Sequence, residues 1–228
     1  MILLAIDCAA NLCAACVYDS TTGVERGRCV VDLGKGHAEH LIGVVDEALA
    51  AAGLGLKDID AIAVSVGPGS FTGIRVAVST ARGFALALGI PAIGVNVLEA
   101  LAEENRAAFP GATILAALTT TGDRVQMGIY DALGVEDYAP SVVGSGEAAL
   151  IAQDKRAVLV GTAASSLASL VEGSVPSIGS QAATADIAAY ARVASRKGVT
   201  GPRPAPLYLR EPDAKPQAGF ILPRRGDA

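Results

Sequence analysis

A buried strand, a glycine-rich loop and a helix follow one another directly in the first half of the chain, and this stretch constrains the fold most. The apolar run 61–66 predicts a buried strand, and the apolar positions of 74–88 recur at helical spacing. Glycines occupy positions 67, 69 and 73 between them. Because glycine permits positive φ and close backbone approach, the chain can turn sharply from sheet to helix here. The pattern therefore predicts a tight strand-to-helix crossover in an α/β fold.

The same loop has a second interpretation, as an anion site at a helix N-terminus. The residues concerned are Gly67, Gly69, Ser70, Thr72 and Gly73. Phosphate loops of nucleoside-triphosphate enzymes end in Gly-Lys-Ser/Thr, and dinucleotide loops have the pattern G-x-G-x-x-G, whereas this loop has G-x-G-x-x-x-G and no lysine. We therefore expect a structural loop, with a weak anion site as the alternative.

Length and composition favour a globular protein with a substantial core. The chain has 228 residues, of which 51% are hydrophobic, enough for one large domain or two small ones. No uncharged apolar run reaches about 18 residues, and no basic segment precedes an apolar one at the N-terminus. We therefore expect neither a membrane span nor a signal peptide, and a cytoplasmic location.

Charge is distributed unevenly along the chain. Residues 1–190 contain 10 Lys and Arg against 20 Asp and Glu, whereas residues 191–228 contain 8 against 3. An acidic body repels nucleic-acid phosphates, so nucleic-acid binding by this chain alone is not expected. The basic, proline-rich stretch 199–228 predicts a solvated tail, with contact to an acidic partner or RNA as the alternative.

Neither the cysteines nor the histidines form a convincing metal-binding pattern. Cys13 and Cys16 are spaced as C-x-x-C, but they fall in a predicted strand, where positions i and i+3 point to opposite faces. We expect them to be core residues. His37 and His40 share one face of a predicted helix, yet the local sequence offers no third ligand. No metal site is expected.

A strand meander followed by helices occurs twice, which predicts two related half-domains. Strands are expected at 2–6, 13–18 and 24–31, and again at 113–118, 124–130 and 135–138. Residues 109–111, Phe-Pro-Gly, read as a boundary, and Thr184 is expected to cap the last helix. The expected division is 1–108, rejoined by the helix at 184–198, then 109–183, then a tail at 199–228.

Residues 66–75, together with Gly83, Gly89-Ile90-Pro91 and Gly94-Val95, closely resemble the signature of the TsaB (YeaZ) family. That family supplies the dimerisation subunit of the bacterial complex that makes N6-threonylcarbamoyladenosine in tRNA. Weaker matches lie at 2–7, 37–41 and 206–210, in the order along the chain that the family has. The resemblance covers residues 2 to about 210, and the ten-residue loop is its most specific part.

This resemblance implies an α/β fold of two ribonuclease-H-like halves, of the actin and Hsp70-ATPase type. It implies a non-catalytic scaffold that binds and activates the catalytic paralogue TsaD, which transfers threonylcarbamoyl to N6 of adenosine 37 in tRNA. A TsaE-like ATPase and tRNA are expected as partners only within the complex, and the chain alone is expected to form a homodimer. No cofactor of its own is expected.

The resemblance further implies that pairing uses the first two helices. In this chain these are residues 37–52 and 74–88, and the second is rich in alanine, which lets another helix approach closely. Some of each apolar set must also face the sheet. The expected partner-interface residues are Leu41, Val44, Val45, Leu49, Ala77, Val78, Ala81 and Arg82.

Two enzymatic alternatives remain. Asp7, at the end of the first strand, could be a degenerate nucleotide site, and with the glycine loop it would serve an ATPase or phosphotransferase of this fold. Cys8-Ala9-Ala10 follows it, however, without glycine or hydroxyl donors, and the second half has Thr-Thr-Thr-Gly at 119–122 where the family commonly has an Asp-Ala-Arg-like turn. A remote alternative is a metallopeptidase-like protein using His37 and His40.

Overall fold

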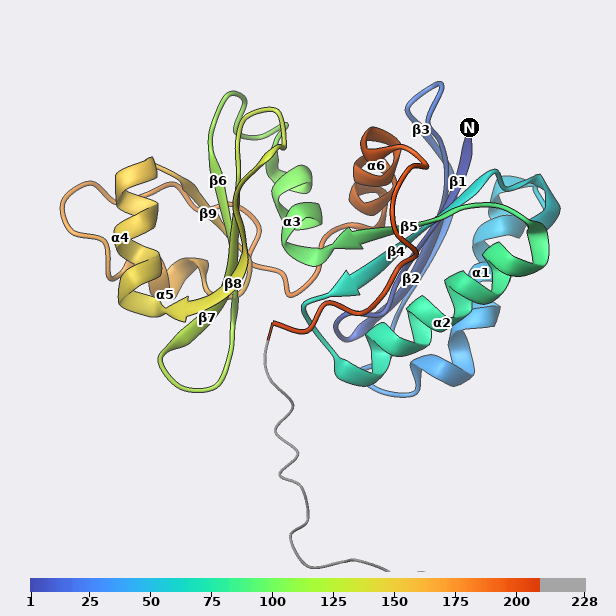
Figure 1. Cartoon of the computed structure of the whole chain (residues 1–228), viewed down its shortest axis with the longest axis horizontal. Helices are drawn as coiled ribbons and strands as arrows, with labels where there is room; N and C mark the ends of the chain where they lie inside the picture. The colour runs from blue at the N-terminus through green and yellow to red at the C-terminus, as the bar shows by residue number, and fades with distance from the viewer. Residues whose placement is uncertain (210–228) are drawn as a thin grey trace, which may run out of the picture.

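Two β-sheets, one of five strands and one of four, form the two lobes of the protein. The computed structural model describes residues 1–209, and the two lobes lie side by side along its longest axis (Figure 1). We call them the first lobe and the second lobe, in chain order. The predicted tail beyond residue 209, including Arg210 of the family resemblance, lies outside the described residues.

The strands of the first sheet are β1 (Ile2–Asp7), β2 (Leu12–Asp19), β3 (Val24–Asp32), β4 (Ala61–Gly67) and β5 (Ala92–Asn96). Their order across the sheet is β3-β2-β1-β4-β5. The first three strands form an antiparallel meander, and β4 and β5 add parallel to β1 on its other side. Because helices cover both faces, β1 and β4 are almost wholly buried, which explains their continuous apolar sequences.

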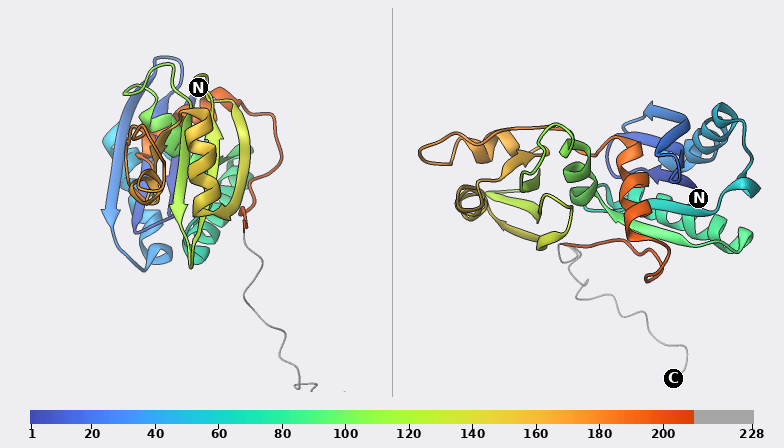
Figure 2. Two further views of the ribbon diagram at one scale, coloured as in Figure 1. Left: turned by 90° about the vertical axis from the view of Figure 1, so that its left-hand side faces the viewer. Right: turned by 90° about the horizontal axis from the view of Figure 1, so that it is seen from above.

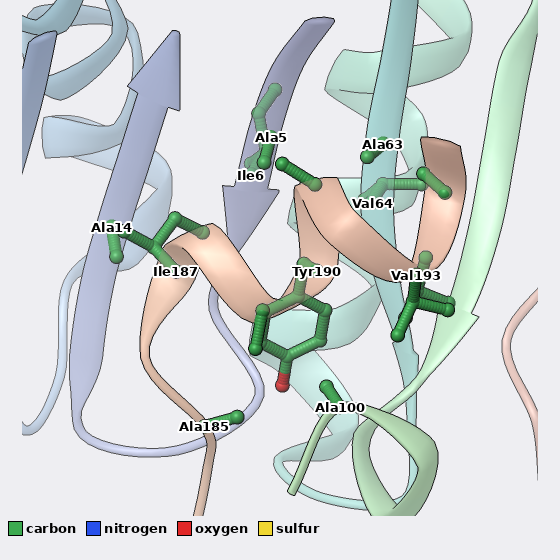
Figure 3. Close-up of a cluster of buried hydrophobic side chains, with 14 of the residues drawn as sticks. Ala5, Ile6, Ala14, Ala63, Val64, Ala100, Ala185, Ile187, Tyr190 and Val193 are labelled. Carbon is green, nitrogen blue, oxygen red and sulfur yellow. The ribbon is translucent and has the colours of Figure 1, made fainter. Parts of the chain in front are cut away.

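The helices of the first lobe are α1 (His37–Ala52), α2 (Phe71–Leu88) and α6 (Ile187–Lys197), and a 3₁₀ turn covers Leu56–Asp58. α1 and α2 pack on one face of the sheet, and α6 crosses the other face (Figures 1 and 2). Figure 3 shows Ile187, Tyr190 and Val193 of α6 lying against side chains of β1, β2 and β4. α6 thus completes the core of the first lobe although it follows the second lobe in the chain.

The strands of the second sheet are β6 (Ile114–Thr119), β7 (Arg124–Tyr130), β8 (Glu136–Gly144) and β9 (Val158–Val160). Their order is β8-β7-β6-β9, with an antiparallel meander and β9 parallel to β6. α4 (Ser145–Lys155) and α5 (Ala164–Ala168) belong to this lobe. The second sheet repeats the first without a fifth strand among the described residues. This repetition agrees with the predicted α/β fold of two ribonuclease-H-like halves.

Two helix starts differ from the sequence-based expectation. α2 begins at Phe71 rather than Ile74, because the Ser70 hydroxyl accepts a hydrogen bond of 3.1 Å from the Gly73 N–H and caps the helix there. The last helix begins at Ile187, and its cap is Asp186, whose carboxylate accepts from the Ala188 N–H at 2.9 Å. The prediction of Thr184 as the cap was therefore wrong.

The cysteines of β2 are core residues, as predicted. Cys13 and Cys16 are fully buried, and all four cysteines of the chain are free thiols. Cys8 is also fully buried, with its sulfur 3.9 Å from that of Cys13.

α3 (Val97–Asn105) and α6 lie between the two sheets, as the view from above shows (Figure 2). A cluster of ion pairs joins the two helices. Glu103 is its centre, since its carboxylate lies 2.7 Å from Arg196, 3.2 Å from Arg106 and 3.5 Å from Arg192. Its side chain is only 10% exposed, so these pairs are partly shielded from water.

Replacing Glu103 with glutamine is expected to lower the free energy of unfolding by about 2 kcal/mol, because three guanidinium groups lose a partly buried counter-charge. The matched control is Asp137→Asn, which breaks an exposed ion pair of 2.9 Å with Lys155 and should change stability little. Urea denaturation of the three proteins measures both effects. Equal losses from the two substitutions would contradict this account.

Candidate partner-binding face

The glycine loop presses against the turn that follows β1. Gly67 and Gly69 have φ of 105° and 155°, a region that side chains rarely adopt. A Cβ at Gly69 would overlap the carbonyl oxygen of Ala9, and a Cβ at Gly73 would overlap that of Cys8. The glycines are therefore required for the close approach of the loop and the start of α2 to the backbone of residues 8 and 9.

Hydrogen bonds within this crossover occupy N–H groups that an anion would need. The Ser70 N–H donates to the Ala9 carbonyl at 2.7 Å, and the Gly73 N–H donates to the Ser70 hydroxyl. The Ile74 N–H donates to the Ser70 carbonyl at 2.9 Å. Thr72 is exposed and lies on the outer surface of α2. These contacts favour the structural interpretation of the loop over the weak anion site.

Asp7 is enclosed rather than open to a ligand. Its side chain is 1% exposed, and its two oxygens accept hydrogen bonds from the Ala9 N–H at 2.9 Å and the Thr184 hydroxyl at 2.6 Å. The Thr184 hydroxyl also lies 2.6 Å from that of Tyr190. Burial raises the pKa of Asp7, although these hydrogen bonds act in the opposite direction. The carboxyl group therefore ties the chain before α6 to the end of β1.

Replacing Asp7 with asparagine is expected to remove a pH dependence of stability between about pH 4 and pH 7. Because the pKa of Asp7 is raised above its ordinary 3.8, the folded state binds the proton more tightly than the unfolded chain does. Wild-type stability should therefore fall as pH rises from about 4 through the raised pKa, and the loss should persist above it. Urea unfolding of both proteins at about pH 4 and about pH 7 tests this. An identical pH dependence in the variant would contradict it.

The two histidines lie in different environments. His37 is buried, with its Nε2 lacking a hydrogen-bond partner in the described part of the chain, whereas His40 is exposed. Within residues 1–209, no group of three or more His, Cys, Asp or Glu side chains is arranged to hold a metal ion. The described part of the chain also contains no helix long and apolar enough to span a membrane.

Most of the predicted interface residues face the sheet, and the prediction needs correction there. Seven of the eight are buried at 5% exposure or less, while Arg82 is exposed. The physical reason is that the apolar stripe of each helix packs against β-strands, as amphipathic helices do on a sheet. Those seven residues pack α1 and α2 against the first sheet. They are Leu41, Val44, Val45, Leu49, Ala77, Val78 and Ala81.

The opposite sides of α1 and α2 form what we call the outer face. It contains the exposed large apolar residues Ile42, Phe71 and Leu86, the last with 82% of its surface exposed. Two glycines inside these helices, Gly43 and Gly83, are also exposed, and a Cβ at either would meet nothing within 4 Å. Its other exposed members include Ala38, Glu39 and Asp46 of α1 and Thr72, Arg75, Ser79 and Arg82 of α2.

Among residues 1–209, no contact explains the two helical glycines. Glycine inside a helix costs about 1 kcal/mol relative to alanine. At Gly73, a glycine is required because the carbonyl group of Cys8 lies too close for a Cβ atom. A Cβ atom at Gly43 or Gly83 would instead meet open space. An open helix surface without side chains allows another helix to approach closely.

The C-terminal segment adds an aromatic residue to the outer face. The Leu207 N–H donates to the Val66 carbonyl at 2.7 Å, which holds the segment beside the glycine loop. The next residue, Tyr208, accepts a hydrogen bond of 2.8 Å from Arg75 Nε, and its ring centre lies 5.9 Å from that of Phe71. The Arg75 guanidinium lies 3.6 Å from the centre of the Phe71 ring. No local pattern in the sequence indicates this cluster, because 133 positions separate Arg75 from Tyr208.

A groove of about 530 Å³ runs between the C-terminal half of α2 and the segment that follows α6. Leu86, Ile90 and Val199 line it, with Arg82 and Arg203. Neither arginine has an ion-pair partner among residues 1–209. On its α2 side, the outer face therefore continues into a basic and apolar groove on a chain whose net charge is −5.

The proteins that this chain resembles belong to one group, the proteins of tRNA threonylcarbamoyladenosine biosynthesis. The family model described as TsaD, tRNA N6-adenosine threonylcarbamoyltransferase, matches residues 32–215. A curated threonylcarbamoyltransferase from Maricaulis maris is 39% identical over 127 residues, which is 56% of this chain. The Escherichia coli protein TsaB, a tRNA threonylcarbamoyladenosine biosynthesis protein, is 36% identical over 104 residues, which is 45% of this chain.

These matches cover only part of the relatives. The chain spans 33% of the length of the Maricaulis protein and 43% of the length of the Escherichia coli protein. A solved structure matches almost end to end. It is a Pseudomonas aeruginosa protein described as similar to the peptidase YeaZ, with a TM-score of 0.75 and 25% identity over 92% of this chain and 99% of its own. This agreement over both lobes confirms the predicted fold class.

The specific loop at 66–75 and the two-lobed fold thus point to the same relatives. The chain belongs to the TsaB (YeaZ) family of tRNA threonylcarbamoyladenosine biosynthesis proteins.

Proposed function

We propose that this chain is a non-catalytic subunit that binds a TsaD-type threonylcarbamoyltransferase through its outer face. In that role it would activate the paralogue for transfer of threonylcarbamoyl to N6 of adenosine 37 in tRNA. The observation that carries the proposal is the pair of open glycines, Gly43 and Gly83, on adjacent helices. Their positions leave room for two helices of a partner, and the family relationship supplies a partner of matching fold.

The size of the outer face suits a stable complex. Two helices packed against two helices can bury roughly 1,200–2,000 Å² in total, which is the range of specific protein interfaces. The exposed Ile42, Phe71 and Leu86 would supply apolar area in such an interface. We also propose that the same face forms an isologous homodimer when the paralogue is absent, since exposed apolar surface favours self-association.

The enclosed Asp7 supports a role without catalysis. A phosphotransferase of this fold would need this carboxylate to be accessible to a nucleotide and its metal ion. Here the Thr184 hydroxyl and the Ala9 N–H occupy its oxygens, and burial raises its pKa. The ATPase alternative would therefore require the segment before α6 to leave its place.

The proposal also covers the assembly of the complex. A TsaE-like ATPase and tRNA would join only after the two paralogues have paired. Pairing on the first lobe would leave the second lobe free for these other partners.

The domain division at residues 108 and 183 remains a proposal. The packing of α6 on the first sheet supports it.

Co-elution with a TsaD-type transferase from the same organism tests the proposal. Size-exclusion chromatography with light scattering should give a single species with the mass of a one-to-one complex. The chain alone should elute as a dimer that the transferase dissociates. Separate elution of the two proteins at concentrations of about 10 μM would contradict the proposed pairing.

A further inference from the structure

Arg75 uses one guanidinium nitrogen in a hydrogen bond within the described chain, and its other two nitrogens remain available as donors. Its Nε bonds to Tyr208, whereas Nη1 and Nη2 form no hydrogen bond with any residue in the described range. A hollow of about 460 Å³ lies beside it, lined also by Ala38, Thr72 and Ser79. The lining combines one cation with hydroxyl groups and contains no carboxylate. The free edge of a guanidinium beside hydroxyl groups is well suited to bind a carboxylate.

We infer that Arg75 is the anchor for a carboxylate side chain of the TsaD-type partner, and that Tyr208 is the positioning residue that holds Arg75 ready. The inference rests on the proposed pairing across the outer face. It adds that the C-terminal segment, far from α2 in sequence, is part of the binding surface.

The stacked arrangement reduces the entropy lost on binding. An arginine side chain loses much rotamer freedom when a partner immobilises it. Here the Phe71 ring, 3.6 Å from the guanidinium, and the Tyr208 hydroxyl have already restricted it. A side chain fixed in advance binds more tightly because this loss precedes association.

The residue types and their exposure also indicate an interface. Phe71 is 59% exposed and Tyr208 is 53% exposed, so both rings present large areas to a partner. Aromatic residues and arginine contribute disproportionately to the binding energy of protein interfaces. Two exposed aromatic rings around one arginine therefore form a compact candidate for the strongest contacts of the outer face.

The sign of charge identifies the partner's chemistry. α2 and residues 199–209 contain Arg75, Arg82 and Arg203 but no Asp or Glu, whereas the exposed acidic residues of α1 are Glu39, Asp46 and Glu47. The basic strip is therefore the α2 side of the outer face. An acidic protein surface would complement this basic strip. The exposed Phe71 and Leu86 favour a protein partner over RNA, because binding to a phosphate backbone relies mainly on many cations.

Affinity measurements with two variants test the inference. The full chain is titrated with the transferase by biolayer interferometry at about 50 mM and about 500 mM salt. Arg75→Ala should weaken binding by about 10- to 100-fold and reduce its salt dependence. Tyr208→Phe keeps the ring but removes the hydrogen bond, and should weaken binding by about 3- to 10-fold. Arg124→Ala, at an exposed arginine of the second lobe, should bind as wild type.

The outcomes separate this inference from the proposed pairing. If Arg75→Ala and Tyr208→Phe bind as wild type while Gly83→Glu does not, the anchor is overturned and the pairing stands. If both variants lose affinity for tRNA instead of the transferase, the inferred partner chemistry is wrong. If the wild-type chain does not bind the transferase at all, both proposals fail.

Discussion

Gly73→Ala is expected to destabilise the protein by about 3 kcal/mol or more, an unusually large effect for adding one methyl group. The added Cβ would overlap the carbonyl oxygen of Cys8, which belongs to the turn after β1. Both the turn and α2 are packed on the same sheet, so neither can move without disturbing the core. Chemical denaturation of the variant measures the loss.

The control for this prediction is the same substitution in the same helix. A Cβ at Gly83 would meet nothing within 4 Å, so Gly83→Ala should raise the free energy of unfolding by about 0.5–1 kcal/mol. Opposite signs for the two substitutions would show that contact with residue 8, and not helix propensity, decides the outcome. A stable Gly73→Ala variant would contradict the proposed function of the loop as a close-packed bend.

Gly83→Glu should weaken binding to the TsaD-type transferase by about 100-fold or more. A glutamate at this position would place a long, charged side chain where the partner's helix has to approach closely. The loss corresponds to about 2.7 kcal/mol of binding free energy. The fold should survive, because the position is open and glutamate favours helix more than glycine does. Affinity is measured by biolayer interferometry and stability by thermal unfolding.

Gly146→Glu provides the matched control in the second lobe. Gly146 is also an exposed helical glycine, and a Cβ there would meet nothing within 4 Å. This substitution adds the same charge in α4, away from the outer face, and should leave binding unchanged. Equal losses from both variants would indicate a general effect of added negative charge and would remove the support for the outer face.

The fold could be predicted well because its signals are local. Continuous apolar runs at β1 and β4 and helical spacing at α1 and α2 specify buried elements within a few residues of their observed bounds. The repeated meander indicated two related halves, and the two sheets have that repeat. Each of these features depends on neighbouring residues along the chain, and sequence shows those directly.

The outer face was harder to predict, because helical periodicity identifies the side that packs on the sheet. Leu41 and Val45 of α1 and Ala77 and Ala81 of α2 are apolar or small for that reason. The outer face has no such stripe, and Gly83 is recognisable as unusual only when its empty surroundings are known. The choice of helices stays a prediction, and seven of the eight residues named on them lie on the sides that pack against the sheet.

Long-range hydrogen bonds account for the other differences. Thr184 has the side chain of a good helix cap, but its hydroxyl bonds to Asp7, 177 positions away, and Asp186 caps α6 instead. Likewise, Tyr208 meets Arg75 only because Leu207 is bonded to Val66 beside the glycine loop. Such pairings depend on the complete fold and leave no trace in a single sequence.

The central claim is that this chain supports threonylcarbamoyl transfer by binding the catalytic paralogue through its outer face. The most direct measurement is the rate of threonylcarbamoyl transfer to tRNA in a mixture reconstituted from the partner subunits. We predict full activity with the wild-type chain and with Gly146→Glu, and little activity with Gly83→Glu or without the chain. Equal rates in all four mixtures would contradict the claim.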